Sequence, residues 1–255
     1  MKAVILAGGL GSRISEETVI RPKPMVEIGG RPILWHIMKI YGAAGINDFV
    51  VCLGYKGDVI KRFFSDYFLR SSDVTFDLRA NSMEVHESRA EPWRVTLADT
   101  GEETMTGGRL LRARKHIGEE PFCLAYGDGL ADIDIKALVE AHGRSGRWAT
   151  VTAVQPPGRY GALKIADGMV TQFEEKPRGD GEWVNGGFFV FEPQIFPFLK
   201  DDATVLEEEP MRGLARSGQL HAFQHSGFWH SLSTINDKAY LERLWQSGEA
   251  PWKIW

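Results

Sequence analysis

Apolar runs and segments with helical spacing alternate along the first half of the chain. Runs typical of buried strands lie at 3–6, 48–53, 121–129 and 149–154. Segments with one apolar face at helical spacing lie at 32–41, 58–68, 106–117 and 135–142, and Pro32 suits the start of its helix. Strands that alternate with helices indicate βαβ units. We therefore expect a Rossmann-like α/β fold, with a mixed, mostly parallel sheet flanked by helices.

Two parts of the chain depart from this alternation. From Ser71 to Thr106, polar and apolar residues alternate without a helical period, which predicts antiparallel strands inserted as a β-ribbon. Beyond Gln155, apolar stretches joined by Gly and Pro predict a small C-terminal β-rich lobe, with helices near 204–217 and 236–246 and a strand near 220–225. No repeat or low-complexity linker divides the chain, so we expect one domain over 1–255. Its core is 1–154, with the ribbon at about 71–106, and its second lobe is 155–255.

Composition and charge exclude several classes of protein. The 255 residues are 43% hydrophobic and 25% charged, which is ordinary for a globular protein that buries its own core. The net charge of −4 leaves no broad basic surface for nucleic acid. No apolar run approaches the roughly 20 residues that span a membrane. Because the chain opens directly into its first strand, we expect a cytoplasmic protein without a signal peptide. Cys52 and Cys123 lie in apolar runs, so we interpret them as core residues.

The first strand leads directly into a glycine-rich loop. Gly8, Gly9 and Gly11 follow the apolar run, and the cations Arg13 and Lys23 come soon afterwards. Glycines let backbone N–H groups approach an anion closely, because no Cβ intervenes. The prolines on both sides of Lys23 predict an extended, stiff backbone there. The pattern predicts a phosphate-binding loop; the alternative is a glycine-rich turn of an ordinary α/β domain.

A carboxylate lies at the end of the strand predicted at 121–129. Asp128 stands between Gly127 and Gly129, at the edge where open α/β sheets bind their ligands. One carboxylate suits Mg²⁺, which usually takes one or two protein carboxylates and completes its shell with phosphates and water. We therefore predict that Asp128 is a magnesium ligand; the alternative is an aspartate that only turns the chain.

A second group of polar residues lies in the C-terminal half. Glu175 and Lys176 precede a proline, and Asn185 begins an Asn-Gly-Gly turn motif. Each feature alone is typical of a solvated surface or an ordinary turn. Together they offer a cation for a second phosphate, from Lys176, and hydrogen bonds for neighbouring hydroxyls, from Glu175 and Asn185. A polyol phosphate requires that mixture of groups.

These motifs together resemble the signature of a known family. The segments GGLGSR, RPKPM, YGDG, EKP and NGGFFV look like those of the sugar-phosphate nucleotidyltransferases, which join a nucleoside triphosphate to a sugar 1-phosphate and release pyrophosphate. The ribbon sequence EPWRVTLADTG and the closing APWK are similar to the bacterial glucose-1-phosphate cytidylyltransferase branch. The resemblance covers essentially the whole chain. It implies that CTP and α-D-glucose 1-phosphate react to give CDP-glucose and pyrophosphate, with Mg²⁺ as cofactor, in a homo-oligomer.

The resemblance also assigns roles to single residues. It implies a nucleotide site in the 1–154 core, formed by Leu6, Gly8, Gly9, Gly11, Ser12, Arg13, Lys23, Gly108, Arg109 and Asp128. It implies a sugar-phosphate site, largely in the 155–255 lobe, formed by Tyr126, Gly161, Glu175, Lys176 and Asn185. Arg13, Lys23 and Asp128 are the implied catalytic residues. Phosphoryl-type transfer requires positioning and charge neutralisation, so a sugar phosphate oxygen attacks the α-phosphorus directly and no protein nucleophile is needed.

One position departs from the family pattern. The family usually has a second metal-binding aspartate after an aromatic pair and before a threonine, where this chain has Ser233. A neutral hydroxyl does not replace that charge, so we expect weaker magnesium binding that depends mainly on Asp128. Asp237 compensates only if the local backbone turns it inward. Two alternatives stay open: a cytidylyltransferase for a different phosphorylated acceptor, and a nucleotide or sugar-phosphate binding protein with little turnover.

Overall fold

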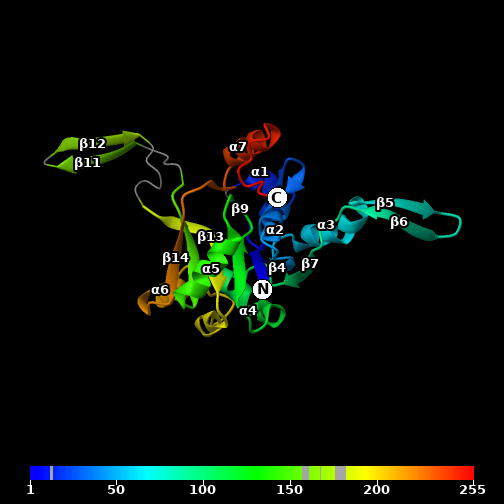
Figure 1. Cartoon of the computed structure of the whole chain (residues 1–255), viewed down its shortest axis with the longest axis horizontal. Helices are drawn as coiled ribbons and strands as arrows, with labels where there is room; N and C mark the ends of the chain where they lie inside the picture. Colours follow the sequence, from blue (N-terminus) through cyan, green and yellow to red (C-terminus); the bar gives the residue numbers. More distant parts are fainter. Residues whose placement is uncertain (12–13, 157–160, 167, 176–181) are drawn as a thin grey trace.

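A seven-stranded mixed sheet forms the centre of the computed structural model, which describes residues 1–11, 14–156, 161–166, 168–175 and 182–255 (Figure 1). The strand order is β14-β10-β13-β8-β1-β4-β7. These strands are β1 (Lys2–Leu6), β4 (Asp48–Leu53), β7 (Arg94–Asp99), β8 (Phe122–Tyr126), β10 (Ala149–Val154), β13 (Val184–Phe191) and β14 (Leu220–His225). Only β13 runs antiparallel to its neighbours, β8 and β10; the other pairs of this sheet are parallel. The predicted mixed, mostly parallel sheet is confirmed.

Helices cover both faces of this sheet. The helices of the described residues are α1 (Ser15–Thr18), α2 (Ile33–Ala43), α3 (Gly57–Arg70), α4 (Thr106–Ile117), α5 (Ile135–Ser145), α6 (Glu209–Arg216) and α7 (Ile235–Gln246), with 3-10 turns η2 (Lys23–Met25) and η4 (Pro193–Phe198), and not all of them lie against the sheet. Along β1, Ala3 and Ile5 join a buried cluster with α2, whereas Val4 and Leu6 join a second cluster with α4 and η4. Successive side chains of a strand point to opposite faces, so a strand covered on both faces is apolar throughout. Among the described residues, no helix is long and apolar enough to cross a membrane.

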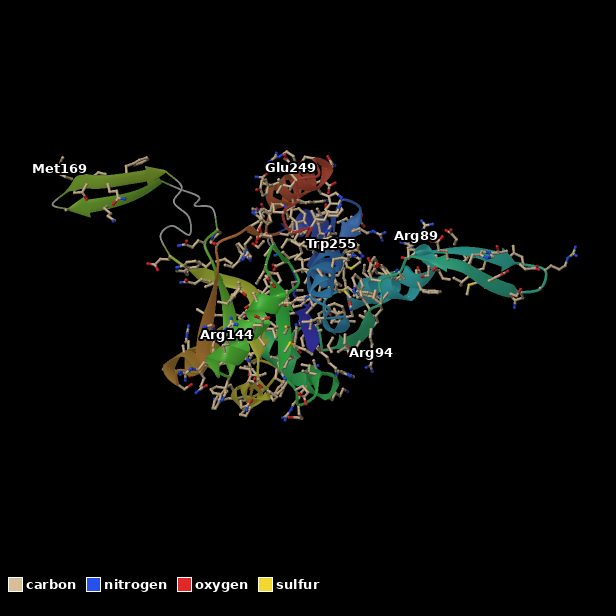
Figure 2. All side chains as sticks on the ribbon, viewed as in Figure 1. Arg89, Arg94, Arg144, Met169, Glu249 and Trp255 are labelled. Atoms are coloured by element: carbon tan, nitrogen blue, oxygen red, sulfur yellow. The ribbon has the colours of Figure 1, made fainter. Side chains whose placement is uncertain are left out.

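Within the described ranges, four smaller strand pairs lie outside the central sheet. They are β2 (Glu27–Ile28) with β3 (Arg31–Pro32), β5 (Ser72–Asp77) with β6 (Ser82–Ser88), β9 (Gly129–Ala131) with β15 (Trp229–Ser231), and β11 (Gly161–Ala166) with β12 (Met169–Glu175). Figure 1 shows the β5–β6 and β11–β12 hairpins extending from opposite sides of the molecule. Figure 2 places Met169 at the outer end of the β11–β12 hairpin and Arg89 where the β5–β6 hairpin meets the body.

The structure corrects the sequence prediction at three places. The ribbon is limited to β5 and β6, because β7 pairs in parallel with β4 at the edge of the central sheet. Only part of the predicted C-terminal β-rich lobe lies apart from the core: β11 and β12 form their own hairpin, whereas β13 and β14 complete the central sheet, where the apolar run that ends β13 is buried. Around Lys23 the backbone forms the 3-10 turn η2 and is not extended, since Val26 N donates to Lys23 O. The two cysteines are buried and free, as predicted.

Candidate active site

A cavity of about 390 Å³ opens beside the C-terminal ends of β1 and β8. Its wall combines the end of β1, the glycine loop, η2, the start of α4 and the end of β8, segments that are distant in the sequence. The residues that line it are Leu6, Ala7, Gly8, Gly9, Gly11, Lys23, Pro24, Thr104, Met105, Thr106, Arg109, Tyr126, Gly127, Asp128 and Glu207. The structure therefore brings together most of the residues predicted for the nucleotide, and Tyr126 from the predicted sugar site.

Lys23 and Asp128 form an ion pair in the wall of this cavity. Lys23 Nζ lies 2.5 Å from Asp128 Oδ2, and the two side chains are 15% and 29% exposed. Their approach depends on Gly127, because a Cβ at that position would lie 2.7 Å from Leu6 O and 2.8 Å from Pro24 Cγ. The glycine thus allows the end of β8 to pass close to both β1 and η2. A cation and a carboxylate are held in the wall of a glycine-lined cavity, which suits a phosphate ligand with its metal ion.

Arg109 lies in the cavity wall, but its guanidinium is bound to the protein itself. Nη1 donates to Leu53 O (3.1 Å), Thr100 Oγ1 (3.0 Å) and Gly101 O (2.6 Å). Nη2 donates to Gly8 O and Glu102 O, both at 2.9 Å. Arg109 is only 4% exposed, and burial lowers the pKa of its guanidinium. In this arrangement the side chain joins the glycine loop to the ends of β4 and β7, and its contact with the triphosphate stays a prediction.

Gly108 lies outside the cavity lining. A Cβ at this position would stand 2.6 Å from both the Cα and the carbonyl oxygen of Asp202. Gly108 N also donates to Thr204 O at 3.2 Å. The glycine is therefore explained by the close packing of α4 against this loop, and its predicted nucleotide contact remains untested.

A hydrogen-bonded chain of polar residues extends from the cavity to β13. Asn185 Nδ2 donates to Tyr126 Oη at 3.0 Å, and Tyr126 Oη donates to Glu207 Oε1 at 2.5 Å. Thr106 Oγ1 donates to the other carboxylate oxygen of Glu207 at 2.6 Å. Tyr126 and Asn185 were predicted from the sequence, whereas Thr106 and Glu207 were not. Glu207 is the first of three consecutive glutamates, a pattern typical of a solvated surface, and the sequence contains no other sign of its position.

The residues around Asp128 fit a magnesium ion that is shared with phosphates. Among the described residues, no cluster of three or more His, Cys, Asp or Glu is placed to hold a metal. Leu232 N donates to Asp128 O at 2.8 Å, so Ser233 lies one residue beyond the backbone partner of Asp128. One carboxylate near this position, together with substrate phosphates and water, meets the usual requirements of Mg²⁺. Ser233 therefore lies close to Asp128 along the backbone, and its place as a second metal position stays a prediction.

Asp237 does not compensate for Ser233 in this structure. Its Oδ1 contacts His230 Nε2 at 2.9 Å, and its Oδ2 accepts from the backbone N–H groups of Ser233 and Thr234 at 2.9 and 2.7 Å. Burial opposes its ionisation, but these hydrogen bonds outweigh burial and lower the pKa of Asp237. The carboxylate belongs to a capping box that begins α7. Compensation for Ser233 would require the backbone to turn Asp237 inward, and these contacts instead hold its carboxylate at the start of α7.

The remaining predicted residues lie outside the described part of the chain or in strands away from the cavity lining. Ser12, Arg13 and Lys176 lie outside the described residues. Gly161 pairs with Glu175 in the backbone register of the β11–β12 hairpin. Figure 1 shows this hairpin apart from the central sheet, whereas Asn185 lies in β13 and contacts Tyr126. The structure therefore places Asn185 against Tyr126 of the cavity wall, although Asn185 does not itself line the cavity, and the predicted sugar contacts of Gly161 and Glu175 stay predictions.

A mixed α/β sheet with a glycine loop, a cation and a carboxylate at one edge is the architecture of an enzyme that handles phosphate esters. The chain belongs to the nucleotidyl transferase family, whose sequence model matches residues 2–237. It is 58% identical over 256 residues to a glucose-1-phosphate cytidylyltransferase of Salmonella typhimurium, and the alignment covers 100% of both chains. The predicted family is confirmed.

Solved structures support the same fold. HddC from Yersinia pseudotuberculosis superposes with a TM-score of 0.71 at 24% identity, over 96% of this chain and 99% of that one. A UDP-glucose pyrophosphorylase complexed with UDP-glucose superposes with a TM-score of 0.70 at 17% identity, over 97% and 98% of the two chains. At these identities the likeness concerns the arrangement of the chain and not the choice of substrate.

Proposed function

We propose that the protein transfers a cytidylyl group from CTP to α-D-glucose 1-phosphate, giving CDP-glucose and pyrophosphate. The full-length identity of 58% with a glucose-1-phosphate cytidylyltransferase carries this proposal. The cavity is consistent with it, because about 390 Å³ lies in the range of small-molecule sites and its glycine-rich rim suits a triphosphate.

The chemistry follows from the residues around the cavity. The glycine loop presents backbone N–H groups to the triphosphate, and Lys23 supplies a positive charge beside them. A phosphate oxygen of the sugar attacks the α-phosphorus in line, the bond from that phosphorus to the bridging oxygen breaks, and pyrophosphate leaves with the bond's electrons. When bound, Mg²⁺ neutralises charge on the phosphates, and Asp128 would hold it. Lys23 also fixes the direction of the Asp128 carboxylate through their 2.5 Å contact.

Measurement of pyrophosphate release tests the proposal. The purified protein is incubated with each of four nucleoside triphosphates and a panel of sugar 1-phosphates, and products are identified by mass spectrometry. CDP-glucose formed from CTP and glucose 1-phosphate is the expected result. Product with only another acceptor would assign the protein to a different cytidylyltransferase activity, and tight binding without product would make it a binding protein.

Two variants connect the activity to the site. Lys23→Met and Asp128→Asn each remove one charge from the cavity, and we expect each to lower kcat/KM by at least about 100-fold, as for loss of charge stabilisation in other active sites. Lys115→Met serves as the matched control, because Lys115 is exposed on α4 and does not line the cavity. Full activity of both cavity variants would disprove the assignment of the site.

Assembly into a homo-oligomer is part of the proposal. The β5–β6 hairpin and its turn expose Phe76, Leu78 and Met83 to 55%, 90% and 49%. An isolated two-stranded hairpin is marginally stable in water, and exposed apolar groups favour contact with another chain. Light scattering coupled to gel filtration is expected to give a mass above that of one chain, and Leu78→Glu is expected to reduce it.

A further inference from the structure

The cavity contains a carboxylate that the proposed reaction does not use. Glu207 lines the same space as Lys23 and Asp128. Both substrates of the proposed reaction carry phosphates, and a carboxylate in a partly desolvated wall repels a nearby anion. A role for Glu207 in the site therefore has to involve neutral, hydrogen-bonding parts of a ligand or the residues that contact them.

The hydrogen bonds around Glu207 have only one possible direction. A carboxylate only accepts, so Tyr126 donates its hydroxyl proton to Glu207 Oε1 at 2.5 Å. At the other end of the chain, Gly187 N donates to Asn185 Oδ1 at 2.8 Å, and a backbone N–H only donates. The Asn185 amide is thereby oriented with Nδ2 toward Tyr126, to which it donates at 3.0 Å. The two ends together determine the orientation of every group between them.

This orientation gives Tyr126 and Asn185 complementary hydrogen-bonding roles. Because Tyr126 donates its proton to Glu207, its oxygen can only accept a hydrogen bond from a ligand. Asn185 Nδ2 has two hydrogens, of which the contact with Tyr126 uses one. Burial, and next the nearby Glu207 carboxylate, raise the pKa of Tyr126, which keeps the phenol protonated. An acceptor and a donor side by side match a sugar hydroxyl, which can donate to the first and accept from the second.

Glu207 is itself held by α4. Thr106, the first residue of α4, donates to Glu207 Oε2 at 2.6 Å, and Thr106 Oγ1 in turn accepts from Leu206 N at 2.9 Å. Thr106 Oγ1 therefore has a donor role and an acceptor role that are both defined. The carboxylate is fixed between α4 and β8, and both of its oxygens point to hydroxyl donors.

We propose that Glu207 is a positioning residue for the acceptor sugar: it fixes the donor and acceptor roles of Tyr126 and Asn185, which then bind sugar hydroxyls. This inference rests on the proposed function, because it concerns the binding of the sugar phosphate. It predicts different effects of a Glu207 substitution on the two substrates. Loss of Glu207 weakens binding of the acceptor and leaves the binding of CTP nearly unchanged, since the glycine loop and Lys23 do not take part in this hydrogen-bonded chain.

The variant Glu207→Gln tests the proposal. Glutamine has nearly the same shape, but its amide nitrogen must donate to Tyr126 or to Thr106, which reverses one hydrogen bond. We expect KM for glucose 1-phosphate to rise roughly 10-fold, with KM for CTP within about two-fold of the parent, as for the loss of one or two hydrogen bonds to a charged group. Glu208→Gln is the matched control, because Glu208 is the exposed next residue and does not line the cavity.

Two further measurements distinguish positioning from a structural role. Tyr126→Phe should raise the same KM, and adding Glu207→Gln to it should have little further effect, because both changes act through one hydroxyl. In protein with ¹³C-labelled tyrosine, the ring resonance of Tyr126 should shift in Glu207→Gln and not in Glu208→Gln. Equal changes of both KM values, additive effects in the double variant, or a lower melting temperature with unchanged KM would overturn the proposal.

The parent protein's own turnover shows whether the proposed function, rather than the role of Glu207, is wrong. A parent protein without turnover of CTP and glucose 1-phosphate contradicts the proposed function. In that event, calorimetric titration with glucose 1-phosphate still compares Glu207→Gln with Glu208→Gln. A selective loss of affinity in Glu207→Gln supports the positioning role, and equal affinities contradict it.

Discussion

Replacement of Arg109 by lysine removes most of the hydrogen bonds by which its guanidinium joins the glycine loop to the segments that follow β4 and β7. In the parent, the guanidinium makes five contacts of 2.6–3.1 Å, four of them to backbone carbonyl oxygens. A lysine ammonium is a single point with three donors and does not reach this set together. The side chain is 4% exposed, so water does not readily replace the lost partners.

The magnitude follows from the number of bonds that are lost. A hydrogen bond to a charged group contributes about 1.5–3 kcal/mol, and neighbouring bonds do not add fully. Loss of two or three therefore lowers the free energy of unfolding by about 3–5 kcal/mol. For a chain of this size each kcal/mol lowers the melting temperature by about 2–4 °C, so we expect a decrease on the order of 10 °C.

Scanning calorimetry without nucleotide measures this change, and Arg112→Lys is the control. Arg112 lies on the same helix, but its contact with Asp202 is at the exposed surface, so we expect a melting temperature close to that of the parent. One result would refute the reasoning: Arg109→Lys melts like the control while its KM for CTP rises. The guanidinium would then act on the triphosphate, as the family resemblance implies, and not as a structural connection.

Three further predictions follow from the same structure. A Cβ on Gly8 would lie 2.2 Å from Arg109 Nη1, whereas Gly9 has nothing described within 4 Å, so Gly8→Ala should lower the melting temperature and Gly9→Ala should not; equal values would contradict this. Burial lowers the pKa of His36 from 6.5 to about 4, so the unfolded chain binds more protons between these values and stability falls as the pH falls from 6.5 to 4. The loss is on the order of 3 kcal/mol, and His36→Gln should flatten this pH dependence in urea titrations; an unchanged slope would disprove it. Ser233→Asp should lower the Mg²⁺ concentration that gives half-maximal pyrophosphate release, and an identical titration curve would count against a weakened metal site.

Local pattern predicted most of the secondary structure. The apolar run of β1 and the helical spacing in α2 are properties of neighbouring residues, and both elements form where the sequence places them. The glycine loop and Asp128 were also predicted, because they directly follow apolar strands in the sequence, and Lys23 was predicted as a cation held between two prolines. The structure then brings these segments to one cavity, as expected from the parallel order of β1 and β8.

The partners of the strands were predicted less well. The segment that forms β7 has the alternation of a ribbon strand, but it pairs with β4, and β13 enters the sheet between β8 and β10. Pairing joins residues that are far apart in the chain, and the pattern within a strand does not identify its neighbour. The buried apolar run of β13 is typical of a central strand. Only the structure shows that its neighbours in the sheet are β8 and β10.

The sequence by itself determined the family of this protein and the candidate groups of its site: a glycine loop after β1, a lysine between two prolines, an aspartate after β8, and a serine where a second aspartate was expected. Only the tertiary structure decided how those groups are used. It placed Arg109 against backbone carbonyls, tied Asp237 into the capping box of α7, and brought Glu207 to Tyr126. The physical reason is the same in each case. A polar side chain takes its role from the partners that surround it, and those partners come from distant parts of the chain.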